Sequence, residues 1–248
     1  MSVPRLSFFD ASAVLFDLDG VLTPTADLHM HAWATMFAAL LDERGARPYA
    51  DDDYFHHLDG RPRYDGVRSL LASRGIEVPE GDPSDPAEAD TVCGIGNRKN
   101  IVFAHLLEAE GIAAYPGSLA VLDRLSAAGV PAAVVSSSKN ARPVLEAAHL
   151  LDRFPVIVDG VVAADEHLPG KPDPAIFLAA AERLHVSADR AVVVEDAIAG
   201  VAAGAAGRFG LVLGVDRGVG ADALTAAGAD AVVHDLAELL TIEEGVPL

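Results

Sequence analysis

Short apolar runs alternate with helical segments through the second half of the chain, and this alternation constrains the fold more than any other feature. The apolar runs, most of them rich in Val, occupy 131–135, 155–158, 191–194, 210–213 and 231–233. Helical periodicity marks the segments around them, at 117–128, 141–148, 174–184, 197–206, 220–227 and 235–240. Strands that alternate with helices of this length form right-handed βαβ units, and strands buried on both faces are continuously apolar. We therefore predict an α/β fold with a doubly wound parallel sheet.

One more apolar run, Ala13–Phe16, precedes the sequence Asp-Leu-Asp-Gly at 17–20. We assign it to the same sheet, in which ligands bind at the carboxyl ends of the strands. Asp17 and Asp19 would share one side of an extended chain. Two carboxylates this close repel each other, so the pair indicates either a metal ion or a nucleophile beside a general acid/base. An ordinary acidic turn is the alternative. A calcium-binding loop is disfavoured, because the next residues supply almost no oxygen ligands.

The segment between this first run and the alternating half has a different pattern. It contains helical periodicity at 26–45, 62–74 and 97–109 but no convincing buried strand. Thr25 is the expected N-cap of the first helix, and we expect the acidic run Asp51–Asp53 to be solvated. We therefore predict a catalytic core formed by 1–24 and 113–248, with an all-helical cap domain, 25–112, inserted above the strand ends.

Composition and charge limit the partners that the chain can have. A formal net charge of −19 at pH 7 argues against nucleic acid and anionic membranes, because both require clustered Lys and Arg. The lone Cys93 cannot form an internal disulfide and fits a reducing compartment. The first ten residues lack the apolar core of a signal peptide, and the stretch 197–206 is too short to span a membrane. We therefore expect a cytoplasmic monomer.

Polar side chains follow several of the predicted strands. Ser136–Asn140 follows one strand, Glu195 and Asp196 follow another, and Lys171 lies in a loop that leads into a helix. Each has a simple structural alternative: Ser and acidic residues often cap helices, and a loop Lys is usually solvated. All of them would nevertheless meet at one edge of the sheet. Acids, hydroxyls and a Lys that converge in one crevice indicate a metal-assisted phosphate site.

The residue types at this edge suit phosphoryl transfer. An Asp nucleophile such as Asp17 can attack phosphorus and form an aspartyl-phosphate, which divides one difficult step into two. Clustered carboxylates suit Mg²⁺, which prefers oxygen ligands. Ser136 and Lys171 can stabilise the charge on the transferring group. Asp19 can protonate the leaving oxygen and then deprotonate the next acceptor.

Taken together, these motifs resemble those of the haloacid dehalogenase superfamily, in the subfamily with a helical cap after the first strand. They are D-L-D-G-V-L-T at 17–23, S-S-S-K-N at 136–140, G-K-P-D-P at 170–174 and V-E-D-A at 194–197. The resemblance covers nearly the whole chain. It implies that Asp17 is the nucleophile, and that Asp19 is the general acid/base and offers its backbone carbonyl to Mg²⁺. It also implies that Glu195 and Asp196 complete the metal site, while Ser136 and Lys171 bind the transferring phosphate.

Motifs in the cap give a narrower resemblance, to the β-phosphoglucomutase family. They are T-x-T-x-x-x-H-x-x-A-W at 23–33, G-R-P-R at 60–63 and R-K-N at 98–100. This resemblance implies that cap residue Arg63 holds a distal phosphate and that Lys99 reaches into the site. The remaining residues implied to bind phosphate or substrate are Thr25, His29, Trp33, Gly60, Ser138, Lys139 and Asn140. For Trp33 the alternative is a place in the cap core, and for His29 a place on a helix face.

The resemblance implies a mutase that interconverts β-D-glucose 1-phosphate and glucose 6-phosphate, primed by glucose 1,6-bisphosphate. A mutase must hold a bisphosphate in both orientations, so it needs the second phosphate subsite that a plain phosphatase does not. A sugar-phosphate phosphatase is the alternative, and a ligand-binding protein on a retained fold is a third possibility. Pro24 at the hinge and Arg61–Pro62 in the cap loop depart from the family pattern, which leaves the hinge motion and the sugar open.

Overall fold

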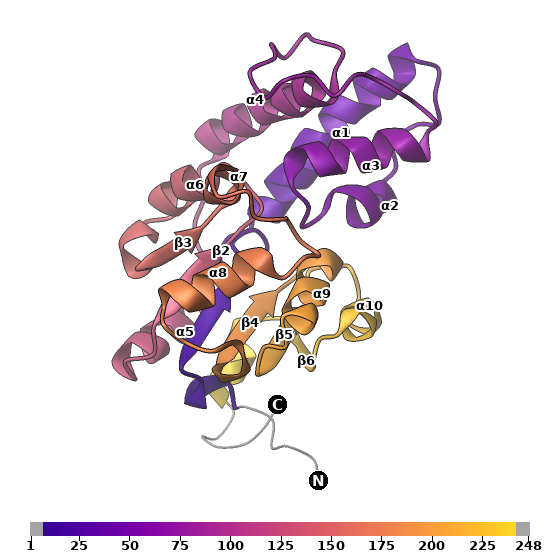
Figure 1. Cartoon of the computed structure of the whole chain (residues 1–248). Coiled ribbons are helices and arrows are strands. Elements are labelled where there is room, and N and C mark those ends of the chain that lie inside the picture. Colours follow the sequence, from indigo (N-terminus) through magenta and orange to yellow (C-terminus); the bar gives the residue numbers. More distant parts are fainter. Residues whose placement is uncertain (1–6, 242–248) are drawn as a thin grey trace.

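A computed structural model describes residues 7–241 of the chain (Figure 1). Its centre is a six-stranded sheet in the order β3-β2-β1-β4-β5-β6, and every neighbouring pair is parallel. The strands are β1 (Ala13–Phe16), β2 (Ala132–Val135), β3 (Val156–Val158), β4 (Ala191–Glu195), β5 (Leu211–Val215) and β6 (Ala231–Val233). The predicted α/β fold with a doubly wound parallel sheet is confirmed.

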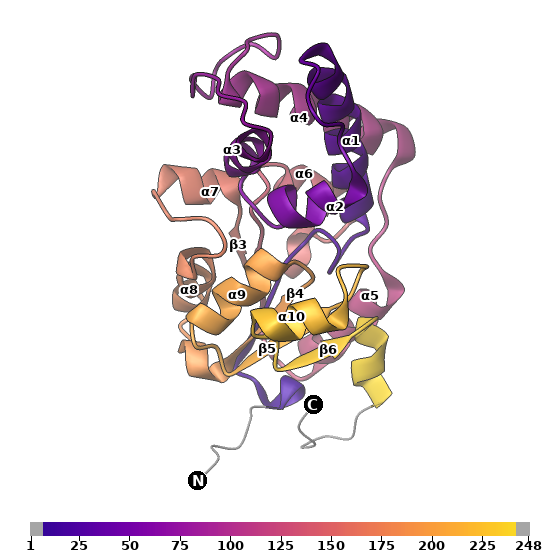
Figure 2. The same ribbon diagram turned by 90° about the vertical axis from the view of Figure 1, so that its right-hand side faces the viewer.

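The strands are apolar along their length because both faces of the sheet are covered. Side chains alternate between the faces: Val14 and Phe16 belong to one core cluster, whereas Ala13 and Leu15 belong to the other. The first face is covered by α5 (Pro116–Ala127) and α6 (Ala141–Ala147), and the second by α8 (Ala175–Arg183), α9 (Ile198–Ala206) and α10 (Ala221–Ala227). Figures 1 and 2 show α8, α9 and α10 side by side on that second face.

A helical part stands above the carboxyl ends of the strands, as both views show (Figures 1 and 2). It consists of α1 (Thr25–Glu43), α2 (Asp51–Asp53), a π-helical turn (Tyr54–Leu58), α3 (Arg63–Ser73) and α4 (Val92–Glu110). These helices have an apolar core of their own, which includes Trp33, Phe37 and Leu70. The cap therefore packs internally, although the domain bounds at 24/25 and 112/113 stay a prediction.

Several local predictions were wrong. Thr25 does not cap α1; it is the first residue of the helix, and its hydroxyl donates to Asp19. Asp53 is buried rather than solvated, because it pairs with Arg74 and accepts a hydrogen bond from the backbone of Ala50. The helix expected at 235–240 is a 3₁₀ segment, Leu236–Thr241, and the short helices α2 and α7 (Gly160–Asp165) were missed. Such short elements carry too few turns to give a periodic signal.

No helix within residues 7–241 has both the length and the apolar character needed to cross a membrane.

Candidate active site

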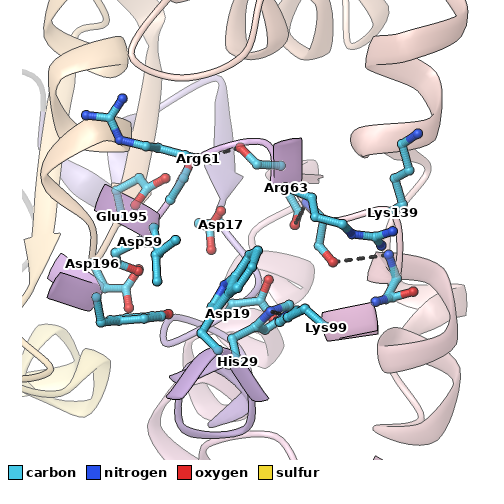
Figure 3. A pocket seen from close by; sticks show the side chains of 18 residues that line it. Asp17, Asp19, His29, Asp59, Arg61, Arg63, Lys99, Lys139, Glu195 and Asp196 are labelled. Carbon is cyan, nitrogen blue, oxygen red and sulfur yellow. Dashed lines mark hydrogen bonds and ion pairs between the residues drawn. The ribbon is translucent and has the colours of Figure 1, made fainter. Parts of the chain in front are cut away.

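A pocket lies where the carboxyl ends of β1, β2 and β4 face the cap (Figure 3). Most of the residues predicted from the sequence line it: Asp17, Asp19, His29, Trp33, Gly60, Arg63, Lys99, Ser136, Ser138, Lys139, Asn140, Glu195 and Asp196. The other two, Thr25 and Lys171, are buried behind the pocket wall and contact Asp19 and Asp17, respectively. Segments far apart in the sequence therefore meet at one place.

Asp17 leaves the end of β1 and is held by a buried cation. Lys171 Nζ donates to Asp17 Oδ1 and to Glu195 Oε1, both at 2.5 Å, and to the carbonyl of Val135 at 3.2 Å. Burial works against the charge of Lys171, but the two carboxylates raise the pKa of its ammonium group above its usual range. Burial raises the pKa of Asp17, Lys171 opposes that shift, and Glu195 and Asp19 add to it. Lys171 thus neutralises part of a cluster of acids.

Asp19 is held from the cap side. The Thr25 hydroxyl donates to Asp19 Oδ1, and His29 Nε2 lies 3.5 Å from the same oxygen. On its other side, His29 Nδ1 is 2.5 Å from Lys99 Nζ. Burial alone would raise the pKa of Asp19, but His29, Thr25 and Lys99 hold it below its usual range. Burial and nearby Arg63 lower the pKa of Lys99 well below its usual value. These contacts therefore favour the ionised form of Asp19.

The turn after Asp19 requires a glycine. Gly20 has φ +85°, and its amide donates to the carbonyl of Thr23 at 2.7 Å. A Cβ at this position would lie 1.7 Å from Asp196 Oδ2. Only a residue without a side chain lets the Asp196 carboxylate approach the turn.

Cationic and amide groups gather at the opposite end of the pocket (Figure 3). Arg63 Nη2 donates to Asn100 Oδ1 at 2.8 Å, and Asn140 Nδ2 donates to the same oxygen at 2.6 Å. Lys139 extends over the ring of Tyr64, 5.4 Å from its centroid. Arg63 and Asn100 come from the cap and Lys139 and Asn140 from the core, so this group forms only when the two parts meet. Such an arrangement can hold a second anionic group.

The cap loop rests directly on the core. Ser137 Oγ donates to the carbonyl of Gly60 at 2.9 Å. Gly60 has φ +67°, and a Cβ there would lie 2.8 Å from Cβ of Ala197. Gly170 allows similar contact, because a Cβ on it would lie 2.2 Å from Cγ of Pro62. The loop that carries Gly60 therefore closes one side of the pocket.

The acids beside Asp17 suit a divalent cation. Burial and the charges of Asp59, Glu195, Asp17 and Asp19 raise the pKa of Asp196 well above its usual range, and a bound cation would favour its ionised form. Within residues 7–241, no three His, Cys, Asp or Glu side chains converge closely enough to hold a metal by themselves. Main-chain oxygens and water would have to complete a coordination shell, as they do for Mg²⁺.

Glu195 is the acid least free to bind a metal. Its side chain is fully buried, and Oε1 accepts from Lys171. Its Oε2 accepts from the backbone N–H of Ala197 at 2.9 Å. The carboxylates of Asp17 and Asp196 are therefore the better candidates for direct ligands.

Sequence reasoning missed part of the lining. The additional lining residues are Tyr54, Leu58, Asp59, Arg61 and Ser137. Ser137 lies inside the S-S-S-K-N motif at 136–140, and Asp59 directly precedes the G-R-P-R motif at 60–63, so both residues could have been predicted from the sequence. Tyr54 and Leu58 belong to a π-helical turn, which is too short to give a hydrophobic periodicity in the sequence.

Comparison with known proteins identifies the family of this chain. The sequence model of the haloacid dehalogenase-like hydrolase family matches residues 11–208. A relative from Mycobacterium tuberculosis, named β-phosphoglucomutase, is 53% identical over 241 residues, which cover 92% of this chain and 91% of the relative. The β-phosphoglucomutase of Bacillus subtilis is 34% identical over 242 residues, 95% of this chain and 99% of that protein.

Solved structures give the same result. A β-phosphoglucomutase from Clostridium difficile matches with a TM-score of 0.75 and 25% sequence identity, over 92% of this chain and 93% of that one. The family match spans most of the sequence, and the relatives are covered over almost their full length. This chain belongs to the haloacid dehalogenase-like hydrolase family, as its motifs predicted.

Proposed function

We propose that this chain is a Mg²⁺-dependent phosphoglucomutase that interconverts β-D-glucose 1-phosphate and glucose 6-phosphate through β-glucose 1,6-bisphosphate. The observation that carries the proposal is the presence of anion-binding groups at both ends of one pocket. At one end Lys171 donates to Asp17 from behind the pocket wall, and Ser136 lines the pocket; Arg63 and Lys139 lie at the far end. The 53% identity to a protein named β-phosphoglucomutase supports it.

In the first half-reaction, phosphorylated Asp17 transfers its phosphoryl group to the 6-hydroxyl of β-glucose 1-phosphate. The bond between Asp17 Oδ and phosphorus breaks as the bond from the sugar oxygen forms. Asp19 accepts the proton of that hydroxyl, because Thr25 and His29 hold it as a carboxylate. Meanwhile the 1-phosphate of the sugar is bound by the distal group of Arg63, Lys139 and Asn140.

In the second half-reaction, the bisphosphate turns end over end, and Asp17 attacks the phosphorus at position 1. The departing sugar oxygen takes back the proton from Asp19, which releases glucose 6-phosphate and restores phosphorylated Asp17. Lys171 stabilises charge on the transferring group in both halves. Free glucose 1,6-bisphosphate primes the cycle by phosphorylating Asp17 for the first time.

The residues present fit Mg²⁺. We infer that the Asp17 and Asp196 carboxylates and the main-chain carbonyl of Asp19 hold it, with Glu195 supporting them from behind. When bound, it supplies the positive charge that reduces repulsion between Asp17 and the incoming phosphoryl group. Two observations favour this assignment. Asp196 is buried among other acids, and Gly20 leaves room for its carboxylate.

The test combines purified protein, Mg²⁺, β-glucose 1-phosphate and a trace of glucose 1,6-bisphosphate, with glucose 6-phosphate and free phosphate measured in the same sample. We expect glucose 6-phosphate with little free phosphate, and no product after the metal is chelated. Release of free phosphate alone would contradict the mutase.

A phosphatase is the second candidate, since the matched family is described as hydrolases. Every group around Asp17 would serve hydrolysis equally well, with water in place of the sugar hydroxyl. The distal group of Arg63, Lys139 and Asn140 then needs another explanation. If free phosphate is the only product, a panel of sugar phosphates would identify the substrate.

A further inference from the structure

Asp59 is a carboxylate that the cap adds to the acids of the core. It follows the π-helical turn, and its backbone N–H donates to the carbonyl of Tyr54 at 2.9 Å. The side chain lines the pocket, and Figure 3 shows it between Asp17, Glu195 and Asp196. It therefore points toward the proposed cation site and away from the distal group near Lys139.

The position of Asp59 is fixed by its neighbours. The buried Tyr54 hydroxyl is within hydrogen-bonding reach of the Asp59 carboxylate. The next residue, Gly60, has its carbonyl bound by core residue Ser137 and its Cα close to Ala197. When the loop rests on the core in this way, the Asp59 carboxylate has to lie among the core acids.

Closing the cap thus brings a fifth carboxylate to a site that already holds those of Asp17, Asp19, Glu195 and Asp196. Asp59 lines the same pocket as these acids, so their like charges repel one another across a space from which bulk solvent is largely excluded. Lys171 is shared by Asp17 and Glu195, and its single positive charge offsets only part of the negative charge of the five carboxylates.

We propose that Asp59 is an outer carboxylate of the Mg²⁺ site, supplied only by the closed cap, so that metal binding and cap closure favour each other. The metal offsets the repulsion between Asp59 and the core acids, and Asp59 in turn strengthens the field that holds the metal. Coupling of this kind is reciprocal by thermodynamic necessity. The inference rests on the proposed function only in taking Mg²⁺ as the cation.

Two measurements without any sugar test this coupling. Calorimetry gives the Mg²⁺ dissociation constant, and small-angle X-ray scattering gives the radius of gyration with and without Mg²⁺. The variant is Asp59→Asn, which keeps the size of the side chain and removes its charge. The matched control is Asp52→Asn, since Asp52 is an exposed cap acid outside the pocket.

We expect Asp59→Asn to bind Mg²⁺ about tenfold more weakly, as is typical when an outer-shell partner of a metal is lost. Its metal-free form should already be compact, so Mg²⁺ should change the radius less than in the wild type. Tyr54→Phe, which removes only the hydroxyl, should move both quantities in the same direction by a smaller amount. Asp52→Asn should match the wild type.

Unchanged affinity and radius in Asp59→Asn would overturn the proposal. So would a change in one quantity without the other, because linkage requires both to move. These measurements stay informative if the mutase assay fails, since no sugar is present. Conversely, a failed coupling test leaves the mutase assay intact.

Discussion

The two ends of the pocket are built in different ways. The end that carries Asp17 and Glu195 rests on β1 and β4, two paired and fully buried strands at the centre of the sheet. The end that carries Arg63 and Lys139 is assembled from α3 and the loop after β2, and it depends on contacts between cap and core.

This difference indicates that the two ends of the pocket have different roles in the reaction. A rigid sheet holds reacting groups within the small tolerances that phosphoryl transfer needs, because central strands have the least freedom to move. The cap end depends on contacts between two parts of the chain, and a mutase needs such an end to open if its bisphosphate intermediate is to reverse its orientation between half-reactions. We therefore expect changes at the core end to affect every reaction, and changes at the cap end to affect only some.

Loss of the nucleophile should have the largest effect. Asp17→Asn keeps the shape of the side chain but cannot form the aspartyl-phosphate, so turnover should fall by on the order of 10⁴-fold or more. Both mutase turnover and hydrolysis of an aryl phosphate should be lost, as measured in parallel assays. Activity near the wild-type level in either assay would show that another group attacks phosphorus.

Loss of the acid/base should come next. Asp19→Asn cannot carry a proton, and such help is typically worth roughly 10²–10⁴-fold in rate. Thr25→Val, which removes only the hydroxyl that contacts Asp19, should lower kcat less and leave KM nearly unchanged. If Thr25→Val raised KM instead, Thr25 would be a substrate contact, as the family resemblance implies.

Arg63→Ala distinguishes the roles of the two ends of the pocket. We expect roughly a 100-fold loss of mutase turnover, the scale of a charge-assisted contact worth about 3 kcal/mol. Hydrolysis of an aryl phosphate, which has no second phosphate, should change little. Lys139→Ala is the matched variant from the core side of the same group. Equal losses in both reactions would mean that Arg63 supports the structure rather than the ligand.

The smallest effect concerns the stability of the cap. Burial would raise the pKa of Asp53, but Arg74 and the Ala50 backbone hold it below its usual value. A lowered pKa stabilises the fold above the unfolded-state pKa, and this contribution is lost as pH falls through the folded-state pKa. Asp53→Asn should therefore cost about 1–3 kcal/mol at pH 7 and progressively less in acid.

Thermal unfolding of Asp53→Asn and wild type from pH 7 down to pH 3 would measure this difference. Asp51→Asn is the control, because Asp51 begins the same short helix but is exposed. A gap in melting temperature that stayed constant with pH would show that packing, not charge, accounts for the loss.

Much of the architecture could be predicted because its causes are local. Continuous apolar runs such as Ala191–Val194 have few alternatives to a buried parallel strand, and strand ends then place Asp17 near Asp196 without further information. Short elements could not be predicted in the same way. The π-helical turn Tyr54–Leu58 spans little more than one turn, so no period reveals it.

The sequence by itself determined the order of the elements along the chain: a strand, two acids, a helical insertion, and then the remaining strands with their polar ends. It also determined which residue types could carry phosphoryl transfer. Only the tertiary structure decided that Lys171 is buried between Asp17 and Glu195, that Thr25 holds Asp19, and that Asp59 reaches the core acids. The physical reason is that a strand pattern depends on neighbouring residues, whereas the charge around a buried acid depends on segments that meet only when the chain has folded.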